Sequence, residues 1–253
     1  MSAGQLAHPT GDRVTAKVRQ LAAESGLGGV RHVSAATLNG PGWTTVVLAL
    51  LVFSLGPVLV GGASPATAAG VGAACVVIFA GILVFLASEK LVVLERGILV
   101  GSFAPFLRPT ALPFAAIDAR TVRAVVANQR TLGLLLADRG VNGGSRTVLW
   151  SRRAVTFIGV APVLAKRAAV TREPLDLATA TGVELWVFSA RNPSSQESLV
   201  RALGTAMRSA GAPGADDVEA LALPAQPVEV SADGADRLAI PERFRAPRVR
   251  RTR

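Results

Sequence analysis

A long stretch without charged side chains constrains the fold of this chain more than any other feature. No Asp, Glu, Lys or Arg occurs between Arg31 and Glu89. Two apolar runs lie within it, at residues 43–60 and 68–87. A helix of about 20 residues, rising about 1.5 Å per residue, crosses a hydrocarbon core of about 30 Å. Because lipid cannot satisfy free backbone N–H and C=O groups, we predict that both runs are transmembrane helices.

The two runs predict an antiparallel hairpin over residues 42–88. Gly61-Gly62-Ala63-Ser64-Pro65 forms a short turn between them, and Trp43 lies where an interfacial aromatic anchor is expected. A signal peptide would begin nearer the N-terminus and would not be followed at once by a second span. We therefore interpret the first run as an uncleaved anchor and disfavour a buried hairpin in a soluble core.

Basic residues near the runs predict the orientation. They flank the pair on both sides, whereas the intervening turn has none: Lys17, Arg19, Arg31, Lys90, Arg96 and Arg108. Cytoplasmic flanks carry the excess of Lys and Arg, so we expect a multi-pass protein of the plasma membrane with both termini cytoplasmic.

Small residues near the start of the second run, Gly70, Gly72 and Ala73 among them, predict a close helix contact. The neighbour is either the first helix or a second copy of the chain. Neither run contains an ionisable residue, which favours an anchor over a transporter.

Residues 1–41 predict a cytoplasmic arm with an amphipathic helix between Asp12 and Leu27. Val14, Val18 and Leu21 share one face of that helix, which would lie on the membrane or on the following domain. A mostly disordered arm is the alternative.

Residues 89–211 predict a domain of strands followed by one helix. Leu91–Leu94 and Ile98–Val100 form a hairpin around Glu95-Arg96-Gly97. The turn-rich segment 138–144 separates two of the further strand candidates, and residues 161–182 predict a loop or a partly helical insertion. Those candidates are residues 112–117, 121–126, 132–137, 147–151, 155–160 and 184–190.

The closing helix has the clearest local signals. Asn192-Pro193 ends the last strand, and Ser194 with Glu197 predicts a capping box. Leu199, Leu203 and Met207 then share one face, and Gly211 ends the helix.

This order of elements resembles the bacterial PH-domain membrane proteins. The resemblance rests on LVVLERGILV directly after the apolar runs, on Leu112-Pro113-Phe114-Ala115-Ala116-Ile117, and on the ending ELWVFSARNPSSQESLVRALGTAM. It covers about residues 91–211 and is lost for a stretch after Val160. It implies an α+β fold: a transmembrane α-helical hairpin, then a PH-like antiparallel β-barrel or sandwich closed by a C-terminal amphipathic helix. Such folds host many functions, so no ligand follows.

Residues 212–253 predict a disordered tail, acidic and then basic, because prolines are scattered through it and aromatic residues are few. Its Arg-rich end, FRAPRVRRTR, is interpreted as a solvated tail, with anionic lipid and then nucleic acid or a protein as weaker alternatives.

Catalytic and metal-binding chemistry finds little support in the sequence. His8 and His32 are the only histidines, Cys75 is the only cysteine, and no paired metal ligands or triad pattern occurs. Gly26-Leu27-Gly28-Gly29 has no GK[ST] after it, which disfavours a phosphate loop. We therefore expect a protein without cofactor or metal that is not an enzyme.

The sequence thus predicts a non-enzymatic integral membrane protein that presents a cytoplasmic PH-like domain for protein or lipid-surface binding. The expected partners are the bilayer and an unidentified protein, which includes a second copy; nucleic acid is disfavoured. Arg96, Arg108, Arg120 and Arg123 are the candidate contacts, because a guanidinium can donate two hydrogen bonds to one phosphate. The alternative is an accessory subunit of a larger transport or envelope-assembly complex.

Overall fold

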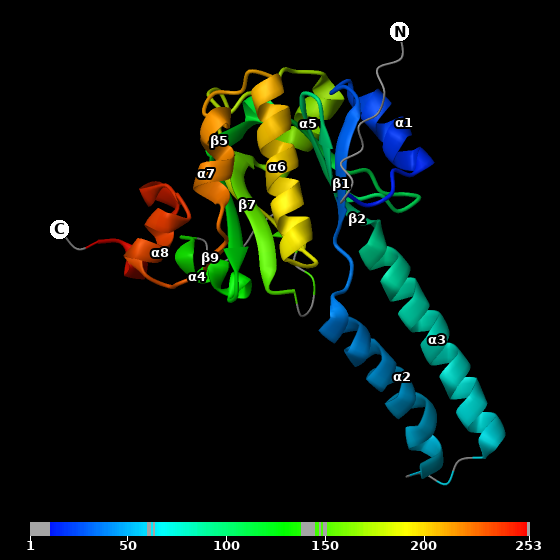
Figure 1. Cartoon of the computed structure of the whole chain (residues 1–253). Helices are drawn as coiled ribbons and strands as arrows, with labels where there is room; N and C mark the ends of the chain where they lie inside the picture. The colour runs from blue at the N-terminus through cyan, green and yellow to red at the C-terminus, as the bar shows by residue number, and fades with distance from the viewer. Residues whose placement is uncertain are drawn as a thin grey trace.

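A computed structural model of the chain describes residues 11–59, 62, 64–137, 145–146, 148 and 151–251. Two helices project from one end of an α+β domain that contains two sheets (Figure 1). Four features named from the sequence lie wholly or largely outside the described residues. These are His8, the centre of the turn at 61–65, the turn at 138–144 and most of the strand expected at 147–151.

The first sheet is antiparallel and has the order β1-β2-β3-β4. The predicted hairpin at Glu95-Arg96-Gly97 is confirmed, since β2 pairs with β3 around it. β1 was not predicted, because its partner β2 lies beyond both apolar runs and nothing local marks it as a strand. The strands are β1 (Val30–Ala35), β2 (Glu89–Leu94), β3 (Gly97–Ser102) and β4 (Thr110–Pro113).

The helices α2 (Gly40–Leu59) and α3 (Pro65–Ser88) follow β1 and lead into β2, and they lie side by side (Figure 1). Among the described residues, one helical stretch is long and apolar enough to cross a membrane: Ala69–Ser88 of α3, none of which is buried. The apolar stretch of α2 is shorter, Gly40–Gly56. Large apolar side chains such as Val52 (65% exposed) and Val77 (71%) are exposed on both helices, and soluble monomers rarely expose so extended an apolar surface.

The second sheet has the order β6-β8-β7-β5-β9, with antiparallel central strands and short parallel edge strands. The predicted barrel is wrong for the described residues, whose two sheets are not closed into one. A 3-10 turn at Phe114–Ala116 ends the ladder of β4, after which β5 takes β7 as its partner. The strands are β5 (Ile117–Val126), β6 (Ser145–Arg146), β7 (Arg153–Val160), β8 (Val183–Ala190) and β9 (Gln226–Pro227).

The helix α6 (Pro193–Ser209) follows β8 and contacts β1, β5 and β7, so it packs on both sheets. Its predicted apolar face is confirmed: Leu199, Leu203 and Met207 are at most 1% exposed. The predicted capping box is wrong in register. Asn192 is the N-cap and Ser195 completes the box, because Pro193 already occupies the first helical turn.

Two shorter helices flank the first sheet. The N-terminal helix α1 (Ala16–Ser25) buries Val18, Leu21 and Ala22 in a cluster that includes β2 and β3, so its apolar face packs on protein and not on lipid. The insertion after β7 forms α5 (Pro162–Thr171).

The strand expected at residues 132–137 is wrong. Those residues form the one-turn helix α4 (Leu132–Leu135), which buries Leu132 and Leu135 on one face. A short apolar run carries no periodicity that could separate a strand from a helical turn.

Residues 212–251 are packed on the domain, so the prediction of a disordered tail is wrong for them. They form α7 (Val218–Ala222), β9 and α8 (Ala232–Arg237). Acidic and basic residues that the sequence separates meet in space: Arg245 Nη2 lies 2.6 Å from Asp236 Oδ1, and Arg251 also pairs with Asp236. The hydrogen bond from Arg245 lowers the pKa of Asp236. The apolar residues buried here are Ala215, Val218, Ala222, Val228, Ala235, Leu238, Ile240, Ala246 and Val249.

Two leucines test whether this segment is part of the folded domain. Leu238 is 2% exposed, whereas Leu221 is 38% exposed. Leu238→Ala should lower the free energy of unfolding by about 2–5 kcal/mol, because it removes buried methyl groups and leaves a cavity. Leu221→Ala should change it by about 0.5 kcal/mol or less. Thermal unfolding of the detergent-solubilised full chain measures both, and equal effects would contradict the packing.

Candidate functional site

The four candidate arginines do not form one site. Arg96 lies at the β2–β3 turn, and β2 begins directly after α3. Six strand residues at about 3.3 Å each place that turn about 20 Å from the end of α3. Arg108 lies in the loop after β3, which runs back toward α3. Arg120 and Arg123 belong to β5 in the other sheet.

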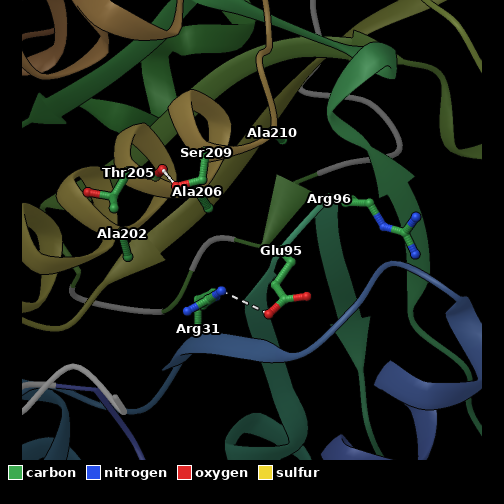
Figure 2. Close-up of a pocket in the computed structure, with 8 residues that line it drawn as sticks. All are labelled: Arg31, Glu95, Arg96, Ala202, Thr205, Ala206, Ser209 and Ala210. Carbon is green, nitrogen blue, oxygen red and sulfur yellow. Dashed lines mark hydrogen bonds and ion pairs between the residues drawn. The ribbon is translucent and has the colours of Figure 1, made fainter. Parts of the chain in front are cut away.

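The pocket at the β2–β3 turn, here called the distal pocket, has a volume of about 610 Å³. Figure 2 shows its two walls, the strand ends with three charged residues and a face of α6 with small residues. Arg31 Nη2 lies 2.8 Å from Glu95 Oε1, while the Arg96 side chain points away from that pair (Figure 2). The lining residues are Arg31, Glu95, Arg96, Ala202, Thr205, Ala206, Ser209 and Ala210.

The glycine-rich segment 26–29 holds the turn beside this pocket. Leu27 O accepts from Arg96 N at 2.9 Å, and Gly29 O accepts from Glu95 N at 3.1 Å. Gly28 has a φ of +93°, and a Cβ there would lie 2.6 Å from Glu95 Oε2. Glycine is therefore required at position 28, because the segment wraps closely around Glu95. This close approach accounts for the glycine-rich sequence without a phosphate ligand.

Polar groups that line the distal pocket have partners within the chain. Glu95 is committed to Arg31, and Arg96 Nη2 donates to Gly26 O at 2.6 Å. Ser209 Oγ donates to Thr205 O within α6. Across the described part of the chain, no three His, Cys, Asp or Glu residues lie close enough together to hold a metal ion.

Arg108 lies beside a second hollow, a groove of about 580 Å³ between α1 and α5. Leu99 of β3 and Ala111 of β4 form its floor, and Leu21 and Val170 line its helical walls. The side chain of Arg108 is 82% exposed and lies 3.9 Å from Glu24 Oε2, a distance at which the ion pair is weak. Arg108 is thus exposed enough to contact a ligand.

Arg123 has a structural role. It is 7% exposed, its Nε donates to Arg237 O at 3.0 Å, and its Nη1 donates to Arg120 O and Val122 O. Burial lowers the pKa of its guanidinium, and the charge of Asp118 partly offsets that effect. Arg123 therefore joins β5 to the C-terminal segment, and Arg120 is an exposed residue beside Gly214.

Polar pairs concentrate where the chain passes between the sheet and the apolar helices. Arg191 donates to Asp12 Oδ1 at 3.1 Å and to Thr37 Oγ1 at 3.2 Å, just before α2. On the other side, Arg146 Nε lies 2.6 Å from Glu89 Oε2, just after α3. These residues are here called the helix-end cluster, and the sequence does not indicate it, because only Glu89 adjoins an apolar run.

The small residues of α3 divide between two environments. A Cβ at Gly72 would lie 3.1 Å from Ser54 Oγ, so Gly72 faces α2. Gly70 has nothing within 4 Å of its Cβ position, and Ala73 is exposed. The predicted close contact therefore involves Gly72, and the other two residues lie on an open face.

No known protein family, no curated protein and no solved structure matches this chain.

Lys90 follows Glu89 of the helix-end cluster and offers a test of that cluster through pH. Burial lowers its pKa, and the charge of Asp12 partly offsets that effect. Between that lowered pKa and the ordinary 10.5, the unfolded chain binds more protons than the folded chain, so this residue makes stability rise with pH. The chain has no tyrosine and only three lysines, so few other groups titrate in this range.

We expect Lys90→Met to remove this alkaline rise in the thermal midpoint of the full chain. Lys166→Met, which leaves Lys90 in place on a different element, should retain it. A wild-type midpoint that shows no rise up to about pH 10.5, or a rise that Lys166→Met abolishes, would contradict the assignment.

Proposed function

We propose that this chain is a non-enzymatic membrane protein whose two-helix hairpin anchors an α+β binding domain directly against the cytoplasmic face of the plasma membrane. α2 and α3 supply the two spans. The domain, PH-like in the order of its hairpin, strands and closing helix, binds a protein or a lipid surface.

The pairing of β1 with β2 carries this proposal. Ala35 lies opposite Lys90, and Ala36 N donates to Glu89 O at 2.8 Å. A chain that leaves the sheet after Ala36 and returns to it at Glu89 crosses a bilayer an even number of times. If α3 spans, α2 supplies the return crossing, and its 20 residues extend about 30 Å.

Charge supports the cytoplasmic side for the domain. If both α2 and α3 span, the N-terminal helix and the C-terminal segment lie on one side of the bilayer. Lys and Arg lie close to both ends of the two helices, at Arg31, Lys90 and Arg96, whereas residues 32–88 carry none. Segments that flank a span and carry such an excess of Lys and Arg remain in the cytoplasm.

The surfaces of the domain support binding. The distal pocket has an apolar helical wall and a charged wall about 20 Å from the bilayer, which suits a soluble protein partner. Arg108 and the groove beside it lie toward the bilayer end of the sheet, which suits lipid.

An accessory subunit of a larger membrane complex is the second candidate. The open face of α3 at Gly70 favours it, because small residues let a neighbouring helix approach closely. Gly70→Leu should then reduce co-purification of a membrane partner by about tenfold, the effect of about 1.4 kcal/mol. Ala73 lies about one helical turn further along the same open surface, so Ala73→Leu serves as the second variant. Unchanged co-purification in both variants would exclude the contact.

The topology is tested with single cysteines in full-length Cys75→Ala protein in intact cells. Ser64→Cys, in the turn before α3, should react with a membrane-impermeant maleimide. Ser25→Cys lies before α2 in the sequence and Ser209→Cys lies after α3. Both variants should react only after permeabilisation. Reaction of Ser25→Cys and Ser209→Cys from opposite sides, or of all three variants from one side, would exclude the hairpin.

A further inference from the structure

The most exposed large apolar side chain outside α2 and α3, among the described residues, is Phe106. It is 98% exposed, and Leu107 beside it is 45% exposed. Both belong to residues 103–109 between β3 and β4, here called the Phe106 loop. A phenylalanine fully in water forgoes the free energy of burial, and contact with an apolar surface would recover it.

The Phe106 loop is held in shape at several points. Leu107 N donates to Ala104 O at 3.0 Å, which closes a turn, and Lys17 Nζ from α1 donates to the same carbonyl. Phe103 is buried in the cluster beneath α1. Phe106 therefore points outward from a fixed turn.

The root of the loop is bonded to the end of α3. Phe103 N donates to Ser88 O at 2.8 Å, and the hydroxyls of Ser88 and Ser102 lie 2.9 Å apart. Ser88 is the last residue of the apolar stretch of α3. Figure 1 shows α3 running straight into β2, and Ser102 pairs with Glu89 at the start of β2. The loop thus leaves the sheet at the level where α3 leaves the bilayer.

We propose that the Phe106 loop is a second, non-spanning membrane contact, which inserts Phe106 into the interfacial region of the leaflet where α3 ends. This inference rests on the proposed membrane anchoring and adds the residue that docks the domain. Aromatic side chains favour this depth, and the exposed Arg108 beside Phe106 adds a cation at the head-group level. Three contacts, α2, α3 and the loop, then fix the tilt of the sheet against the bilayer.

The test uses the full chain with Phe106→Trp in nanodiscs whose lipids carry bromine near the head-group end of the acyl chains. The emission of the wild-type chain, which has three tryptophans, is subtracted. The added emission should be blue-shifted, and brominated lipid should quench most of it.

Val163→Trp is the matched control. Val163 is 75% exposed at the start of α5, just after Val160 of β7. Arg191, just after β8, contacts Thr37 beside α2, so the C-terminal end of β8 lies near the apolar helices. Val160 pairs with Val183 at the other end of β8, so Val163 lies at the end of the sheet away from those helices. The control tryptophan should therefore be quenched by aqueous iodide and not by brominated lipid.

The outcomes separate this inference from the proposed function. If Trp43 of the wild-type chain is quenched by brominated lipid while the tryptophan at position 106 behaves like the control, the chain is anchored and the Phe106 loop is not a membrane contact. If Trp43 also escapes quenching, the proposed anchoring itself fails. Quenching at position 106 but not at position 163 supports the inference.

Discussion

The pairing of β1 with β2 is the interaction on which the rest of the structure depends. It joins residues on either side of both apolar helices, from Val30 opposite Leu94 to Ala35 opposite Lys90. The entropy of closing such a long excursion grows only slowly with its length, so a short buried ladder is sufficient to hold it. Because β2 leads directly from α3, the same ladder fixes the first sheet to the helices without a flexible linker.

The two ends of this sheet have different chemistry. At the end next to α3, ion pairs and serine hydroxyls surround the point where the chain changes from apolar helix to strand. At the other end, a glycine-rich segment encloses the Glu95 turn, and Arg31 pairs with that carboxylate beside α6. The first arrangement concentrates polar contacts beside the apolar helices, and the second leaves a charged and apolar surface at the end away from those helices.

The C-terminal segment completes the second sheet through a mixture of apolar burial and charge pairing. Val228 and Leu238 are 2% exposed, and the buried guanidinium of Arg123 donates to Arg237 O across the interface. Its acidic and basic halves neutralise each other through Asp236, Arg245 and Arg251. The composition of this segment is typical of disorder, because its charged residues are many and its aromatic residues few. Composition does not reveal that folding pairs the acidic residues with the basic ones.

The sequence by itself determined the features that depend on near neighbours. These are the apolar stretch of α3, the β2–β3 hairpin and the buried face of α6, which follow from hydropathy, a short turn and helical spacing. Tertiary structure decided what depends on distant partners: β1, the buried role of Arg123, the packed C-terminal segment and the separation of the two sheets. It also placed Arg96 and Arg108 at opposite ends of the first sheet, because β3 lies between them in the sequence and runs from one end of that sheet to the other.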